Sequence, residues 1–117
     1  MTRKNQLDLF AGIRVSDYPV ALRWYERLLG VPPTFSPHKT EAVWELAKHR
    51  FLYITEQPQT AGRAVLLLFV SNVEAHVAEI AGRGLFPSER DELPDGVRKI
   101  TFRDPDGNEV AFGGGQT

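Results

Sequence analysis

The pattern of apolar and polar positions along the chain nearly repeats itself. Alternation predicts a first strand over residues 7–15, with Phe10 the only large apolar side chain on its more polar face, which also holds Asp8, Gly12 and Arg14. Helical spacing follows over residues 20–29. A second apolar run, residues 64–70, leads into a second helical pattern over residues 73–81, and Val70 aligns with Val15 at an offset of 55 residues (70 − 15). We therefore expect two copies of one supersecondary unit in the 117 residues.

Residue types at the helix ends support both helices. Asp17 is a good N-cap, Pro19 suits the first turn, and Gly30 suits the position after the last turn. Ser71 to Glu74 matches a capping box for the second helix. The apolar stripe of the first helix predicts that its two aromatic residues pack in the core; the stripe consists of Val20, Ala21, Trp24, Tyr25 and Leu28.

The other elements are shorter. In the first copy we expect strands near residues 34–36, 42–46 and 50–55, and in the second copy near 86–88, 97–102 and 108–112. Residues 89–96 form a charged loop, and residues 104–107 have type I turn chemistry. Residues 64–70 are apolar on both faces, which predicts a strand buried on both sides.

Each copy thus has the order βαβββ. The segments Val15-x-Asp17, Trp24-Tyr25, Leu28-x-Gly30 and 104–108 (Asp-Pro-Asp-Gly-Asn) resemble the vicinal-oxygen-chelate superfamily. This group includes glyoxalase I, extradiol dioxygenases, fosfomycin-resistance enzymes and bleomycin-resistance proteins. The resemblance implies an α+β fold, in which two βαβββ modules in tandem form a cup-shaped half-barrel of mixed sheet with helices on the outside. It also implies a homodimer. One domain would span residues 1–117, with module 1 at about 6–56, a linker at about 57–62 and module 2 at about 63–113.

The resemblance also implies where a metal would bind. Metal-dependent members place a His on the first strand and a Glu on the last strand of each module, because imidazole and carboxylate hold the divalent ion. These positions fall here on Phe10, Tyr53, Val65 and Ala111. Only Tyr53 could bind a metal, as a phenolate. The three histidines, at positions 38, 49 and 76, share no ligand spacing, so we expect no metal and no other cofactor.

Apolar side chains are expected to line the cup instead. The predicted ligand-binding residues are Phe10, Trp44, Tyr53, Val65, Leu67 and Ala111, with the face of Trp44 uncertain by one residue of register. Aromatic walls suit a planar or hydrophobic small molecule. Alternatively, these residues simply fill the cup. Glu109 is a weak catalytic candidate: buried alone it could act as a general base, whereas at a solvated strand end it would not.

Composition excludes several classes of binding partner and of reaction. A net charge of −1 gives no support to binding nucleic acid or an anionic membrane. The absence of cysteine excludes disulfides and thiolate chemistry. No apolar run could span a bilayer, and no signal-peptide core follows the basic start, so we expect a cytoplasmic protein.

Three functional hypotheses follow. The first is a metal-free protein of the bleomycin-resistance type that sequesters a small hydrophobic or aromatic compound, such as an antibiotic. Bleomycin itself is not favoured, because a strongly cationic ligand calls for a more acidic protein. The second is a lyase, isomerase or dioxygenase with an atypical site. The third is a dimeric interaction module whose cup is filled.

Overall fold

The computed structural model describes residues 6–115, and its first half is a four-stranded mixed sheet with one helix. In chain order the elements are β1 (Leu9–Val15), α1 (Tyr18–Leu29), β2 (Phe35–His38), β3 (Glu41–Ala47) and β4 (Arg50–Glu56). The strand order in the sheet is β1-β4-β3-β2. Strands β1 and β4 are parallel, and the other two pairs are antiparallel.

The second half repeats this arrangement after a short 3-10 turn, η1 (Pro58–Thr60). Its elements are β5 (Val65–Phe69), α2 (Val73–Gly82), β6 (Glu89–Glu92), η2 (Pro94–Gly96), β7 (Arg98–Arg103) and β8 (Glu109–Gly114). The strand order is β5-β8-β7-β6, with β5 parallel to β8. The tandem βαβββ fold is therefore confirmed. Within residues 6–115 no ladder joins the two sheets, so β1 and β5 are open edges and no closed barrel forms.

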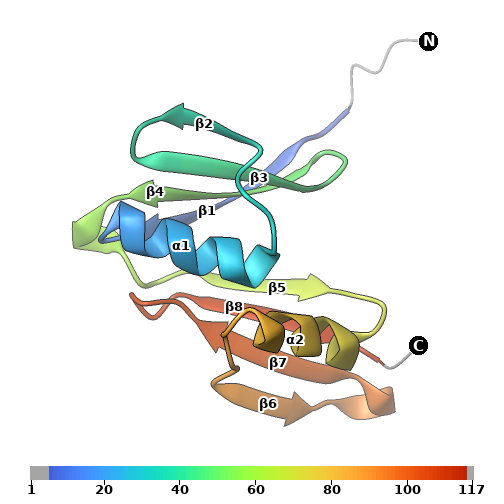
Figure 1. Ribbon diagram of the computed structural model, residues 1–117. Helices are drawn as coiled ribbons and strands as arrows, with labels where there is room; N and C mark the ends of the chain where they lie inside the picture. Colours follow the sequence, from blue (N-terminus) through green and yellow to red (C-terminus); the bar gives the residue numbers. More distant parts are fainter. Residues whose placement is uncertain (1–5, 116–117) are drawn as a thin grey trace.

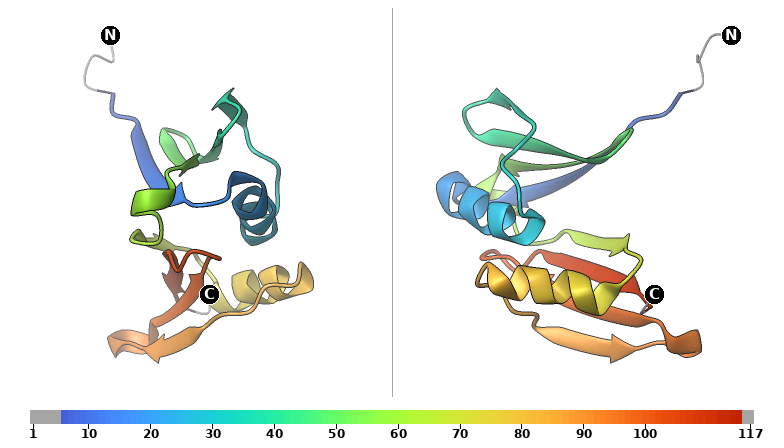
Figure 2. Two further views of the ribbon diagram at one scale, coloured as in Figure 1. Left: turned by 90° about the vertical axis from the view of Figure 1, so that its left-hand side faces the viewer. Right: turned by 45° about the vertical axis from the view of Figure 1, so that its right-hand side comes forward.

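Both helices lie on the same side of the two sheets (Figures 1 and 2). One core runs under them through both modules; it includes Ile13, Tyr25, Leu52, Ile80 and Phe112. The helices also meet directly, because the Arg83 guanidinium after α2 donates a 3.1 Å hydrogen bond to the carbonyl of Leu28 near the end of α1. No helix in the described part of the chain is long and apolar enough to cross a membrane.

Helix α1 has the ends that its sequence predicts. The Asp17 side chain accepts a hydrogen bond from the backbone N–H of Val20, and Gly30 follows the last turn in the left-handed region with φ of 81°. The buried stripe is Ala21, Tyr25 and Leu28, whereas Val20 is 38% exposed. The stripe is therefore rotated by about one residue from the predicted one.

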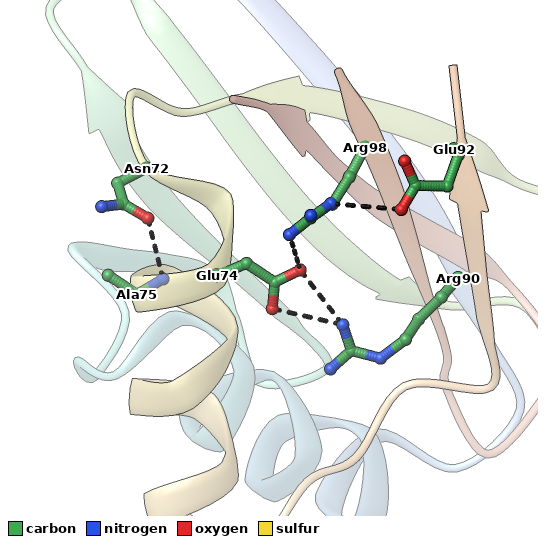
Figure 3. Close-up of polar contacts among 6 residues, drawn as sticks. All are labelled: Asn72, Glu74, Ala75, Arg90, Glu92 and Arg98. Atoms are coloured by element: carbon green, nitrogen blue, oxygen red, sulfur yellow. Dashed lines mark hydrogen bonds and ion pairs between the residues drawn. The ribbon is translucent and has the colours of Figure 1, made fainter. Parts of the chain in front are cut away.

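Helix α2 begins differently from the capping box that we expected. Asn72, not Ser71, is the N-cap, and its side chain accepts from the N–H of Ala75 (Figure 3). Glu74 is instead turned toward the sheet, where Arg98 on β7 lies 3.0 Å away and Arg90 on β6 lies 3.2 Å away. A carboxylate gains more from two guanidinium groups than from one backbone N–H, and Asn is as good a cap as Ser.

The edge strand that carries Arg90 is a second difference from the predicted elements. Residues 86–88 form no strand, and the last edge strand, β6, covers Glu89–Glu92, which we expected to be a loop. All four residues of β6 are exposed, so no apolar alternation marks it. Its pairing to β7 and the bonds of Arg90 to Glu74 hold it in place.

The burial of strand β5 also differs from what its sequence predicts. Only one of its faces packs against the core; the other leaves Val65 71%, Leu67 52% and Phe69 66% exposed. A strand that is apolar on both faces is buried on both sides only where other elements cover both faces of its sheet. Within the described residues no element covers the second face of β5. Its apolar side chains on that face are therefore exposed.

The turn between β7 and β8 connects the two modules. Asp104 and Gly107 close the turn with a 2.9 Å backbone hydrogen bond, as predicted. The buried Asp104 carboxylate accepts a 2.9 Å bond from the Tyr25 hydroxyl of α1, and the buried Asn108 amide donates to the carbonyl of Arg14 at 3.0 Å. Burial, and then the charge of Asp104, raise the pKa of Tyr25 far above its ordinary value, so Tyr25 stays a donor at ordinary pH.

Candidate functional site

The positions at which metal-dependent relatives would carry ligands occupy equivalent places in the two sheets. Phe10 on β1 corresponds to Val65 on β5, and Tyr53 on β4 corresponds to Ala111 on β8. On β1 and β4 the paired residues are Phe10 with Phe51 and Gly12 with Tyr53. On β5 and β8 the corresponding pairs are Val65 with Glu109 and Leu67 with Ala111. Paired residues share a sheet face, so all of these side chains stand on the face away from the helices.

Three aromatic rings form a cluster on this face of the first sheet. Phe10 stacks on Phe51 with ring centroids 4.4 Å apart and planes 7° apart, and it meets Tyr53 edge-on at 6.5 Å. Tyr53 lies against Gly12, where an added Cβ would come within 2.6 Å of the ring. Gly12 therefore makes room for this orientation of Tyr53. Phe10 remains 48% exposed, so the cluster presents an aromatic surface to solvent.

A polar cavity of about 510 Å³ lies on one side of this cluster. Tyr53 and Gly12 belong to its wall, as do residues from the linker and the turn before β8. The other lining residues are Arg14, Thr55, Thr60, Arg63, Ala64 and Asn108. The cavity therefore sits at the seam between the two modules.

A second cavity, of about 600 Å³, is mostly apolar. Phe51 and Leu67 line it, and so do Trp44, His76 and Phe112 on the helix side of the sheets. The His76 ring lies 4.5 Å from the ring of Phe112. Burial is the main reason that the pKa of His76 lies below its ordinary value, so this imidazole is neutral at pH 7.

The predicted ligand-binding residues are thus distributed rather than gathered in one cup. Tyr53 lines the polar cavity, Leu67 and Trp44 line the apolar one, and Phe10 contacts the aromatic walls of both. Val65 lies exposed at the start of β5. Ala111 is buried in the middle of β8, with 2% of its surface exposed.

Trp44 lies on the face opposite to Phe10 and Tyr53. It pairs with Leu52 and is 1% exposed, and its indole N–H donates a 2.9 Å bond to the carbonyl of Val31. The sequence left the face of Trp44 open, and in the structure this residue belongs to the core on the helix side of the sheet. The register between β3 and β4 is the physical reason, since a shift of one residue moves a side chain to the other face.

Comparison with known proteins places this geometry in a family. The family model of the Glyoxalase/Bleomycin resistance protein/Dioxygenase superfamily matches residues 6–112. The chain belongs to this superfamily. No curated protein sequence matches it.

Solved structures agree with this membership. The chain is similar to a glyoxalase/bleomycin resistance protein from Catenulispora acidiphila DSM 44928, with 48% identity, a TM-score of 0.91, and 93% of this chain and 98% of that chain covered. The antibiotic binding protein TnmS3 from Streptomyces sp. CB03234 has 24% identity and a TM-score of 0.71 over 95% and 97% of the two chains. Lactoylglutathione lyase from Agrobacterium tumefaciens has 18% identity and a TM-score of 0.69 over 92% of each chain. The last two show the shared fold alone.

The residues present do not fit the divalent metal of the metal-dependent superfamily members. Of the four equivalent positions, three hold Phe10, Val65 and Ala111, which have no donor atom, and Tyr53 alone cannot hold an ion. No group of three His, Asp or Glu side chains within residues 6–115 is placed to hold one elsewhere. We therefore derive no chemistry through a metal at these positions.

Glu109 is neither alone nor deeply buried in this superfamily member. Arg103 on β7 lies 3.3 Å from its carboxylate, and 36% of the Glu109 side chain is exposed. A general base activated by burial needs isolation in an apolar environment. Glu109 lacks that environment.

Sequence reasoning missed three residues that the geometry brings to the site. Phe51 alternates with Tyr53 along β4, and that spacing could have identified it as part of the same face. Arg14 shares the polar face of β1 with Phe10, which the alternation did indicate. Arg63 had no sequence signal, because only the path of the linker brings it to the cavity.

Proposed function

We propose that this protein is a metal-free small-molecule binding protein that sequesters a hydrophobic or aromatic compound, with antibiotics among the candidate ligands. The observation that carries the proposal is the aromatic cluster of Phe10, Phe51 and Tyr53. Phe10 and Tyr53 stand at positions equivalent to metal-ligand positions of the superfamily, and the cluster is partly exposed beside two cavities. Rings held in this way bind planar ligands by stacking and burial, with no bond made or broken.

The comparisons give the proposal further support. A protein with 48% identity is described as a glyoxalase/bleomycin resistance protein, and a protein with the same fold is described as antibiotic binding. A lyase or dioxygenase function with an atypical site has less support, because Glu109 is paired with Arg103 and the metal-ligand positions lack donors.

The test is a paired measurement on Phe10→Ala. A ring buried in a core would cost about 3–5 kcal/mol on truncation, whereas a ring that is half exposed costs far less. We expect a stability loss near 1 kcal/mol in urea, because about half of the ring is already in solvent. Affinity for an aromatic ligand found by thermal-shift screening should fall by roughly 1–3 kcal/mol, as for a lost stacking partner.

Phe86→Ala is the matched control, because Phe86 is 72% exposed and lies outside the cluster and both cavities. It should leave binding unchanged. If Phe10→Ala loses 3 kcal/mol or more and no aromatic compound stabilises the wild type, the proposal is wrong and the interaction module with a filled cup is the better description. Tight equimolar transition metal in the purified protein, lost on mutation of Tyr53, would contradict the metal-free part.

We also propose that the chain forms a homodimer. Leu9 on β1 and Val65 and Phe69 on β5 expose 59%, 71% and 66% of their surface along two open sheet edges. Symmetric pairing covers such edges and apolar groups. Sedimentation of a 13.2 kDa monomer at micromolar concentration or above would count against it.

A further inference from the structure

The polar cavity between the modules carries a positive charge that nothing in its wall balances. Arg14 comes from β1 and Arg63 from the segment before β5, and both line this space. None of the lining residues is acidic. The whole chain has a net charge of −1, so the positive charge of this cavity is a local feature.

Neither guanidinium has a hydrogen-bonded or ion-paired partner among residues 6–115. Other arginines in the same fold are engaged: Arg90, Arg98 and Arg103 with carboxylates. Both arginines are exposed, so both are accessible to an anion that enters the cavity, and each would attract it. Arginine also presents paired N–H groups that match the two oxygens of a carboxylate or phosphate.

Neutral donors in the same wall complement the two charges. The hydroxyls of Tyr53, Thr55 and Thr60 belong to residues of the lining, and none of the three donates or accepts a hydrogen bond within the described residues. Asp106, the acidic residue of the nearby turn, already accepts hydrogen bonds from the backbone N–H of Ser16 at 2.9 Å and from its hydroxyl. Donors are therefore available here, and the carboxylate of the adjoining turn has partners of its own.

The polar cavity and the aromatic cluster are continuous through Tyr53. Its ring contacts Phe10, and the same residue lines the cavity with Arg14. Along β1 the residues Phe10, Gly12 and Arg14 follow one another on one face, two positions apart, so the Cα atoms of Phe10 and Arg14 are roughly 13 Å apart. Gly12 carries no side chain, so the Tyr53 ring lies between them.

From these observations we infer that the polar cavity is an oxyanion site, and that the ligand of this protein is an aromatic compound with an acidic group. The rings of the ligand would lie on Phe10, Phe51 and Tyr53, and its carboxylate or phosphate would enter the cavity toward Arg14 and Arg63. This inference rests on the proposed binding function and specifies the ligand class for it.

Three probes with one ring system test the inference by calorimetry at low salt: 2-naphthoate, 2-naphthyl phosphate and the neutral 2-naphthalenemethanol. Wild-type protein should bind at least one of the acids about 10- to 100-fold more tightly than the alcohol, which is the contribution of a hydrogen bond to a charged group. Comparison of the two acids distinguishes a carboxylate from a phosphate site. Arg14→Gln and Arg63→Gln should each remove most of this preference by weakening the binding of the acids.

Arg23→Gln is the matched control, since it removes the same charge from an exposed position of α1 that lines neither cavity. It should preserve the preference for the acids. Equal affinity of wild type for the acids and the alcohol, or an equal loss of preference in all three variants, would overturn the oxyanion site while the binding function stands. Binding of none of the probes, together with a failed aromatic screen on the wild type, would overturn both. Melting temperatures of the variants within about 2 °C of wild type would exclude a folding defect as the cause.

Discussion

Removing the hydroxyl of Tyr25 tests the connection between the two modules. Tyr25→Phe keeps the ring in a site with no exposed surface, so the substitution opens no cavity. It removes one 2.9 Å hydrogen bond to the Asp104 carboxylate. A hydrogen bond to a charged group contributes about 1.5–3 kcal/mol.

The structure points to the lower end of this range. Asp104 retains three donors in the variant: the backbone N–H groups of Asp106 and Asn108, both at 2.9 Å, and the side-chain amide of Asn108 at 2.8 Å. We therefore expect a loss of about 1.5–2 kcal/mol in the free energy of unfolding. For this chain length 1 kcal/mol corresponds to about 4 °C, so the melting temperature should fall by roughly 6–8 °C.

Urea unfolding followed by tryptophan fluorescence measures the free energy, and calorimetry measures the melting temperature. Tyr18→Phe is the control, because Tyr18 lies on the same helix and its hydroxyl makes no hydrogen bond within residues 6–115. A loss below about 0.5 kcal/mol for Tyr25→Phe, or an equal loss for Tyr18→Phe, would refute the reasoning that this hydrogen bond stabilises the module junction.

Three further predictions concern pH and the site. Burial and Asp104 raise the pKa of Tyr25 in the folded state, so stability is full below the unfolded value of about 10 and falls above it; alkaline unfolding should be less steep in Tyr25→Phe than in wild type. Although partial desolvation opposes it, hydrogen bonds from Arg90 and Arg98 lower the pKa of Glu74. Stability from Glu74 is therefore present above its unfolded value of about 4.3 and lost as pH falls, so urea midpoints of wild type and Glu74→Gln should converge between about pH 5 and 3. Gly12→Ala should displace Tyr53 and weaken binding of aromatic ligands about tenfold or more in calorimetry; unchanged affinity would show that the Tyr53 ring is not held in the orientation seen here.

Local patterns in the sequence determined most of the elements and their order. Period-2 alternation in residues 7–15 and helical spacing in residues 20–29 are properties of single segments, as are the cap at Asp17 and the left-handed residue Gly30. Repetition of these segments was enough to identify two βαβββ modules. The sequence also showed that Phe10, Val65 and Ala111 have no donor atom for a metal, because the chemical groups of a side chain do not depend on packing.

The remaining features depended on contacts between segments that are distant in the chain. The face of Trp44 follows from its register against Leu52. The exposed face of β5 follows from the lack of a second layer over it within residues 6–115. The charged strand β6 is stabilised by pairing with β7, which its own composition does not indicate. Arg14 and Arg63 line one cavity only because the linker folds back over β1. Tertiary packing alone decides such proximity, because each segment's sequence contains no information on what will lie beside it.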